Sequence, residues 1–118
     1  MMHGMHRFGD TYYEAFAEAV DARRRFRPAP DPADALSMIE AAGHEVVSTA
    51  ARSALSERAP FAVSQLTLLA WRGIDDAQER FAQAVTAQDA YGATGAIEAA
   101  AAHLALVEAV SLHVAAAS

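Results

Sequence analysis

Histidines and carboxylates carry most of the chemical potential of this chain, because it contains five histidines and no cysteine. Glu40 and His44 lie four positions apart, a spacing that places both side chains on one face of a helix. Di-iron bundles also combine a carboxylate with a histidine on one helix, but as Glu-x-x-His pairs backed by carboxylates from other helices. Here the spacing is Glu-x-x-x-His and occurs once, so a solvated side-chain pair is the better interpretation.

His103 and His113 share one stripe of an apolar segment near the end of the sequence. Their spacing corresponds to about 15 Å along a helix, so the two rings do not share a metal ion. A histidine on an apolar face is usually a core residue with one ring nitrogen hydrogen-bonded, and we favour that interpretation over a ligand or pH-sensing role.

The first three residues, Met1-Met2-His3, form a pattern that can chelate Cu(II) or Ni(II) through the amine, two amides and the imidazole. Such a pattern is short and commonly accidental. We therefore expect residues 1–10 to be a flexible tail, and we predict no metal site and no cofactor. Nucleophilic catalysis also lacks support, since no serine stands in a glycine-flanked elbow, and we expect no catalytic residue.

The composition limits the classes of protein that this chain can represent. At 118 residues, 53% of them hydrophobic, the sequence predicts one domain, over residues 11–118. A net charge of −6 argues against non-specific nucleic-acid binding. All nine basic residues are arginine, which indicates a GC-rich, bacterial genome. No apolar leader is visible, so we expect a cytoplasmic protein.

Helical periodicity dominates the sequence, and apolar residues never alternate over a useful length. We predict helices over residues 11–27, 31–55, 61–88 and 96–117, with Thr11 as the first N-cap and Pro28–Pro30 as a rigid linker. The first helix has an apolar face of Tyr13, Phe16, Ala17 and Val20, and the cluster of Arg23, Arg24, Arg25 and Arg27 at its end is interpreted as a solvated face. The third helix has an apolar stripe at heptad spacing, formed by Val63, Thr67, Ala70, Ile74, Ala77, Phe81 and Ala84. Short connections between the predicted helices force neighbouring helices to run in opposite directions. The expected fold is therefore all-α, a four-helix antiparallel bundle.

The last predicted helix has two apolar stripes, although a helix at the edge of a bundle needs only one. Glu108 and the two histidines within it argue against a membrane span. The helix is therefore either central or shared with another subunit, and we predict a homodimer. The second stripe supplies the expected interface, formed by Ala99, His103, Leu106, Val110 and His113.

Gly43 and Gly73 interrupt good helices, each at a cost of about 1 kcal/mol relative to alanine. Both lie fifteen residues from Arg58 in the predicted turn, so an antiparallel hairpin places them at one height. Neutral drift and a close backbone approach, with Trp71 laid over Gly43, are equally good interpretations.

Two resemblances bear on function. The stretch from Arg80-Phe81-Ala82-Gln83-Ala84-Val85 to His103-Leu104 resembles the last helices of the ligand-binding domain of FadR-type regulators. Those domains often end in an Asp, then alanines, then His-Leu, whereas Asp89 and His103 lie further apart here. The alanine-rich, cysteine-free helical character also resembles phasins, which coat polyester granules.

Three functions therefore remain open. The first is a non-enzymatic, oligomeric helix bundle that acts through protein–protein interaction, as an accessory subunit or scaffold that binds a partner protein. The second is a small-ligand-binding domain with an apolar pocket lined by Trp71, Phe81 and His103. The third is a phasin-like surface coat.

Overall fold

The computed structural model describes residues 12–25, 31–57 and 60–117, and within these ranges every regular element is a helix. The all-α class is therefore confirmed. The described residues form five helices rather than four: α1 (Tyr13–Arg25), α2 (Pro32–Ala41), α3 (Glu45–Glu57), α4 (Pro60–Thr86) and α5 (Ala90–Ala117).

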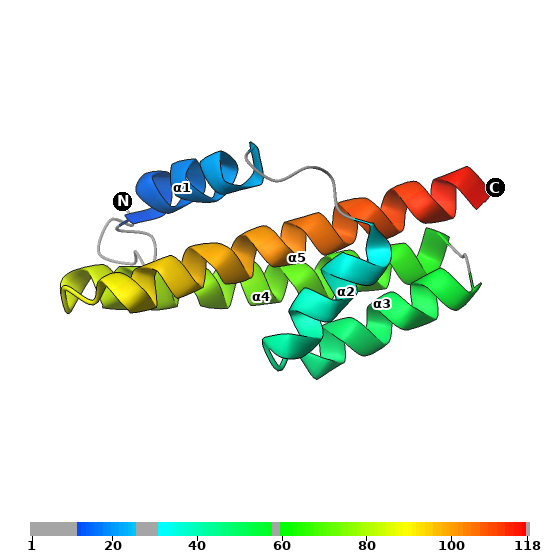
Figure 1. Cartoon of the computed structure of the whole chain (residues 1–118), viewed down its shortest axis with the longest axis horizontal. Helices are drawn as coiled ribbons and strands as arrows, with labels where there is room; N and C mark the ends of the chain where they lie inside the picture. Colours follow the sequence, from blue (N-terminus) through cyan, green and yellow to red (C-terminus); the bar gives the residue numbers. More distant parts are fainter. Residues whose placement is uncertain (1–11, 26–30, 58–59, 118) are drawn as a thin grey trace, which may run out of the picture.

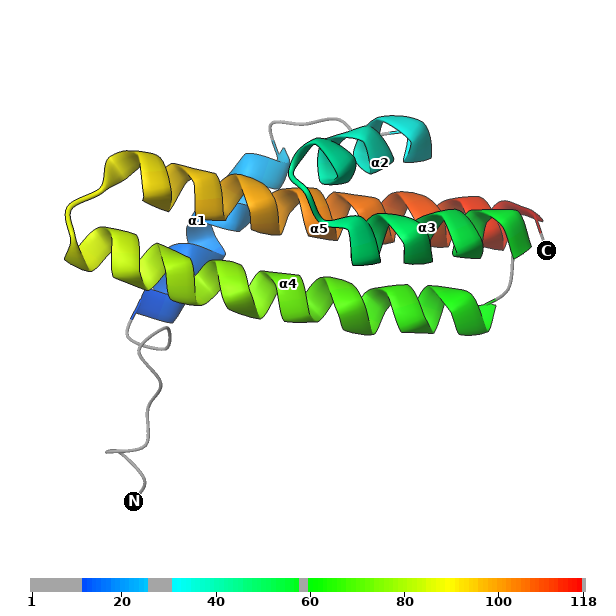
Figure 2. The same ribbon diagram turned by 90° about the horizontal axis from the view of Figure 1, so that it is seen from below.

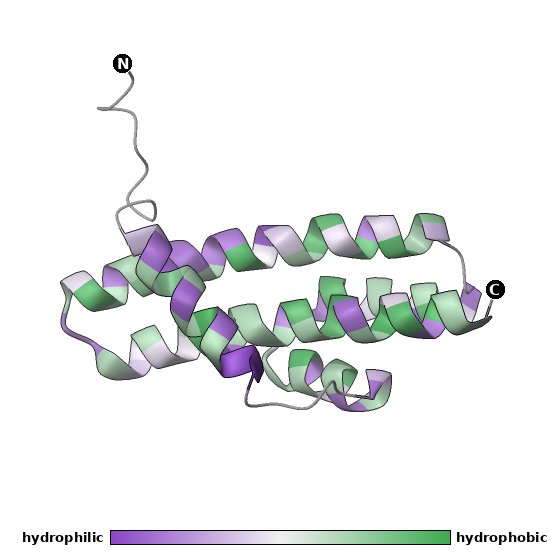
Figure 3. Cartoon of the chain, turned by 90° about the horizontal axis from the view of Figure 1, so that it is seen from above, coloured by the Kyte–Doolittle hydropathy of each residue, from purple (hydrophilic) through white to green (hydrophobic). Residues whose placement is uncertain are grey.

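The two longest helices, α4 and α5, form an antiparallel hairpin against which the other helices pack (Figures 1 and 2). The shorter helices cover different halves of it. Helix α1 lies across the half that contains the α4–α5 turn, whereas α2 and α3 pack against the half that contains the end of α5. The hydrophilic residues of α1 stand out in Figure 3, where this helix crosses the hairpin.

Two apolar clusters hold these parts together. The first joins α2 and α3 to the hairpin and includes Ile39, Leu66, Leu106 and Val110, all fully buried. The second joins α1 to the other half of the hairpin through Phe16, Val20, Ile74 and Phe81, along with alanines of α4 and α5. The stripe predicted along the third helix is confirmed from Ala70 to Ala84, where all its members are buried, whereas Val63 and Thr67 are half-buried.

The helix predicted over residues 31–55 is wrong, because the chain reverses direction at Gly43. The Gly43 amide bonds the Glu40 carbonyl at 3.0 Å, and the His44 amide bonds the Ile39 carbonyl at 3.2 Å. This pair of bonds is a Schellman motif, in which the residue after the helix adopts a left-handed conformation. Gly43 has a φ of +82° and meets that requirement without steric cost. Gly43 therefore ends α2, and Trp71 does not lie over it, since nothing is within 4 Å of its Cβ position.

The turn predicted over residues 89–95 is shorter than expected. Gln88 has a φ of 56°, and the amides of Gln88 and Asp89 bond the carbonyls of Val85 and Ala84, which makes a second Schellman motif. Asp89 then caps α5 by accepting a hydrogen bond from the Gly92 amide at 3.0 Å. Residues 90–95 are thus helical, and this helix begins six residues earlier than predicted.

The dimer interface predicted on α5 is also wrong for three of its five residues. Leu106, Val110 and His103 have zero exposure within a single chain, so they are not available to a second copy. The physical reason is that α5 lies at the centre of the fold and packs against all four other helices. Its second stripe is covered by α2 and α3, which the sequence analysis had treated as one helix. Ala99 is half-buried and His113 is exposed.

Residues 90–116 of α5 are long and apolar enough to cross a membrane by length and composition. The central helix of a bundle has the same composition, and α5 occupies that position here. The predicted Thr11 cap, the 1–10 tail with its Met1-Met2-His3 pattern, and the Pro28–Pro30 linker lie outside the described residues.

Candidate functional site

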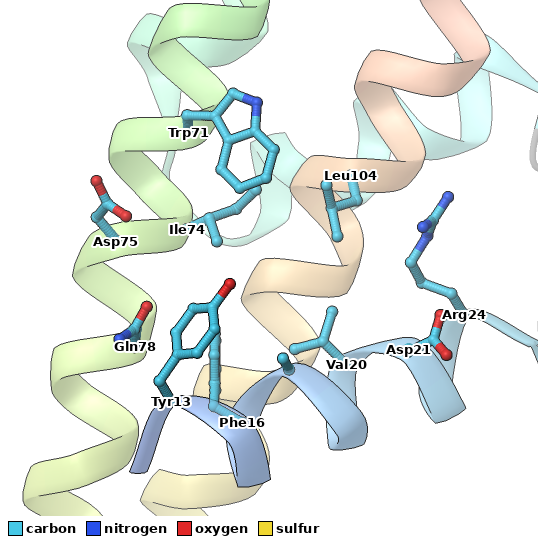
Figure 4. A pocket seen from close by; sticks show the side chains of 11 residues that line it. Tyr13, Phe16, Val20, Asp21, Arg24, Trp71, Ile74, Asp75, Gln78 and Leu104 are labelled. Atoms are coloured by element: carbon cyan, nitrogen blue, oxygen red, sulfur yellow. The ribbon is translucent and has the colours of Figure 1, made fainter. Parts of the chain in front are cut away.

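A pocket of about 310 Å³ lies where α1 crosses the α4–α5 hairpin (Figure 4). Its volume falls at the lower end of the range of small-molecule sites, which is about 300–1,000 Å³. Three helices contribute to its wall, which consists of Tyr13, Phe16, Ala17, Val20, Asp21, Arg24, Trp71, Ile74, Asp75, Gln78 and Leu104.

The inner part of the pocket is apolar. Phe16 and Val20 lie one turn apart on α1 and are buried. The Phe16 ring packs on the Phe81 ring with centroids 5.3 Å apart and an interplanar angle of 50°, a favourable tilted arrangement. Leu104 of α5 faces them across the cavity (Figure 4). This part of the pocket therefore suits the hydrocarbon portion of a ligand.

Aromatic side chains form the outer part of the pocket. Trp71 is 52% exposed and Tyr13 is 56% exposed, although both belong to residue types that normally bury much of their surface. Figure 4 shows the Trp71 ring of α4 and the Tyr13 ring of α1 at the cavity, with the Ile74 side chain between them in this view. Large aromatic residues that stay half exposed beside a cavity are typical of binding surfaces.

Charged and polar groups surround this aromatic opening. Asp21 pairs with Arg25 at 2.6 Å, and Arg24 reaches Glu108 of α5 at 3.5 Å. Asp75 lies on the α4 side and has no ion-pair partner among the described residues. The pocket thus combines an apolar interior with carboxylates at its rim.

Ion pairs orient α1 on the hairpin. Arg23 pairs with Glu98 at 2.6 Å, and the Arg24–Glu108 contact lies two to three turns further along α5. The arginine cluster had been interpreted as a solvated face, yet two of its members bridge to α5. Because these pairs are half exposed, they position α1 more than they stabilise the fold.

The structure separates the three residues predicted to line a pocket. Trp71 lines the cavity, and Phe81 lies behind Phe16 as its packing partner. His103 belongs to a different region, where its ring fills the space beside Gly73 and meets the His44 ring edge-on with centroids 4.6 Å apart. The neighbouring residue, Leu104, takes the place in the pocket that the sequence analysis gave to His103.

His103 is a core histidine with one bonded nitrogen, as predicted. Its Nδ1 lies 2.8 Å from the Ala99 carbonyl oxygen, so Nδ1 carries the proton and donates a hydrogen bond to that oxygen. Its Nε2 is buried without a hydrogen-bond partner among the described residues. Burial lowers the pKa of His103, and the nearby His44 and Arg80 lower it further, against the opposing effect of the Ala99 bond. The neutral ring is therefore the stable form.

The other candidate ligands do not assemble. Glu40 pairs with Arg52 of α3, while His44 lies beyond the Gly43 turn and contacts His103. His113 is exposed, which contradicts its interpretation as a core histidine. Within the described ranges no group of three or more potential ligands could hold a metal ion.

A second, wider groove of about 550 Å³ lies on the α4–α5 hairpin near the α2–α3 turn. Its wall is mostly alanine and glycine, and its cationic residue Arg80 is paired with Asp76 at 3.1 Å. Nothing in this wall selects a ligand. The pocket beside Trp71 is therefore the better candidate site.

Several pocket residues were not predicted from the sequence to line a pocket. Tyr13, Phe16 and Val20 were interpreted as an ordinary core face, because their spacing alone does not show that α1 leaves a gap beneath it. On α4, the spacing of Trp71, Asp75 and Gln78 places an aromatic and two polar side chains on adjacent turns of one face. From that mixture of aromatic and polar residues on one face, a pocket on α4 could have been predicted.

No protein-family model matches the chain, and neither a curated protein nor a solved structure is similar enough to match it.

Proposed function

We propose that this protein is a small-ligand-binding helical domain, and that the ligand enters the pocket between α1 and the α4–α5 hairpin. The observation that carries the proposal is the aromatic-lined cavity of about 310 Å³, with a buried floor of Phe16 and Val20 under a half-exposed Trp71. An apolar cavity with a few polar groups at its mouth is the usual form of a small-molecule site.

Filling the cavity tests this function. Ala17 lines the pocket, whereas Ala22 lies on the same helix, is exposed and is not part of the wall. Ala17→Phe should abolish binding of the neutral apolar probe N-phenylnaphthylamine, and Ala22→Phe should leave it unchanged. Trp71 is the only tryptophan, so energy transfer from it to the probe reports the location of binding. Equal probe binding by both variants would contradict the proposal.

We infer a second candidate function, protein–protein interaction, from an exposed stripe on α4. Phe61 and Leu68 are 72% and 63% exposed, and together with Trp71 they fall within one face of the helix. Such residues are enriched at interfaces. This stripe replaces the buried α5 residues as the surface through which a homodimer or a partner protein would bind, and it would equally serve a coat on an apolar particle.

Light scattering at micromolar concentration tests the dimer. If the stripe is the interface, Leu68→Glu should give monomers, whereas Val46→Glu, at an exposed position on α3, should not change the mass. A wild-type monomer would exclude self-association at this concentration.

A further inference from the structure

The charge at the mouth of the pocket is unbalanced. Two carboxylates, Asp21 and Asp75, and one guanidinium, Arg24, belong to its wall. Asp21 already has Arg25 as its counter-ion, and Arg24 has Glu108. Asp75 is the rim charge that has no ion-pair partner among the described residues. An incoming group at the α4 side of the mouth therefore meets a carboxylate that none of the described residues holds in an ion pair.

The aromatic rings beside this carboxylate favour the same sign of ligand charge. The face of a tryptophan or tyrosine ring carries negative potential and attracts cations, most strongly where water is partly excluded. Trp71 lies one helical turn before Asp75, so both side chains project from neighbouring positions of α4. Tyr13 approaches from α1 and adds a second ring (Figure 4).

The floor excludes a ligand that is only a small, hydrated cation. Phe16 and Val20 are buried, and Leu104 and Ile74 complete an apolar surface below the rings. A metal ion or an ammonium ion without carbon substituents would lose hydration there without gaining oxygen ligands. The charge of the ligand must therefore be carried on a hydrocarbon body.

We propose that the ligand is an organic ammonium compound, whose apolar body lies on Phe16 and Leu104 and whose cationic head lies against α4, at the part of the wall that Trp71 and Asp75 line. This inference rests on the proposed ligand-binding function and specifies its ligand class. It differs from that function in requiring a positive charge on the ligand.

Two probes of nearly equal shape separate the charge from the shape. Phenyltrimethylammonium and tert-butylbenzene differ by the replacement of a quaternary nitrogen with carbon. We expect quenching of Trp71 fluorescence to show at least about tenfold tighter binding of the cation at low salt, and a loss of this preference at high salt. Competition with N-phenylnaphthylamine confirms that both probes occupy the cavity.

Neighbouring aspartates provide a matched pair of variants. Asp75→Asn keeps the shape but removes the rim charge, and it should weaken binding of the cation about tenfold while binding of tert-butylbenzene stays the same. Asp76→Asn makes the same change in net charge one residue away, outside the pocket wall, and should affect neither probe. Both aspartates are exposed, so both variants should fold.

Each result decides one of the two proposals. Equal affinities for the two probes, or equal effects of Asp75→Asn and Asp76→Asn, would overturn the ammonium inference and leave an apolar ligand site. Failure of both probes and of N-phenylnaphthylamine to bind would overturn the ligand-binding function itself, and the ammonium inference with it.

Discussion

Replacing Gly73 with alanine should destabilise this protein, although alanine is the better helix former. An alanine Cβ at this position would lie 2.5 Å from Nε2 of His103 and 2.9 Å from its Cδ2. Ordinary contacts begin near 3.4 Å, so the ring would have to move by about 0.9 Å (3.4 − 2.5). The ring has little freedom to do so, because Nδ1 bonds Ala99 on one side and His44 packs against its edge.

The expected magnitude follows from two opposing effects. Removing glycine from a helix interior gains about 1 kcal/mol. Overpacking a core costs about 1–3 kcal/mol, and weakening the His103–Ala99 hydrogen bond adds about 1 kcal/mol. The net loss in free energy of unfolding should be about 1–3 kcal/mol. With an unfolding entropy of roughly 2.1 cal/mol/K per residue, each kcal/mol lowers the melting temperature of this chain by about 4 °C.

Gly95 is the matched control, because it lies inside α5 and nothing is within 4 Å of its Cβ position. Gly95→Ala should raise the melting temperature by about the same 4 °C per kcal/mol, and Gly73→Ala should lower it. Calorimetry or circular dichroism measures both. In the double variant Gly73→Ala/His103→Ala the clash disappears, so a double-mutant cycle should show a coupling of at least about 1 kcal/mol. If Gly73→Ala stabilises as much as Gly95→Ala, the close approach of the His103 ring to Gly73 is incorrect.

Three further predictions concern the turn, pH and metal ions. Gln88→Gly should stabilise the fold by about 1 kcal/mol in urea unfolding, since glycine adopts the left-handed conformation of residue 88 without strain, and a lower urea midpoint would argue against this. Because the pKa of His103 is lowered in the folded state, the unfolded chain takes up a proton first as the pH falls through 6.5. As the pH falls from about 7 to about 5, the free energy of unfolding of the wild type should therefore decrease more steeply than that of His103→Gln, by up to about 1.4 kcal/mol per pH unit. Parallel pH profiles of the two proteins would refute this. Thermal melts with and without a strong chelator should coincide, whereas a drop of many degrees on chelation would reveal a metal site.

The sequence predicted the helical class and much of the core correctly, because both depend on local periodicity. Seven residues from Val63 to Ala84 repeat at heptad spacing, and the structure buries the last five of them. Phe16 and Val20 were likewise correctly placed on the inner face of the first helix. His103 was correctly interpreted as a core residue with a bonded nitrogen.

The break at Gly43 was within reach of sequence reasoning but was misjudged. A glycine inside an apolar pattern is compatible with a tolerated defect or with the end of a helix, and the periodicity continues almost in register across this one. Placing α2 and α3 side by side, instead of end to end, gives α5 a second set of neighbours. This single error led to two wrong predictions, that the second stripe of the last helix is exposed and that Leu106 and Val110 form a dimer interface.

By itself, the sequence determined that the chain is helical, which faces of its helices are apolar, and that Trp71 belongs to a candidate pocket. Only the tertiary structure decided what covers each face. It placed α1 on one half of the hairpin and α2–α3 on the other, put His103 against Gly73, and put Leu104 in the pocket. The physical reason is that periodicity specifies the direction in which a side chain points from its own helix, whereas its burial depends on which other helix packs against that face.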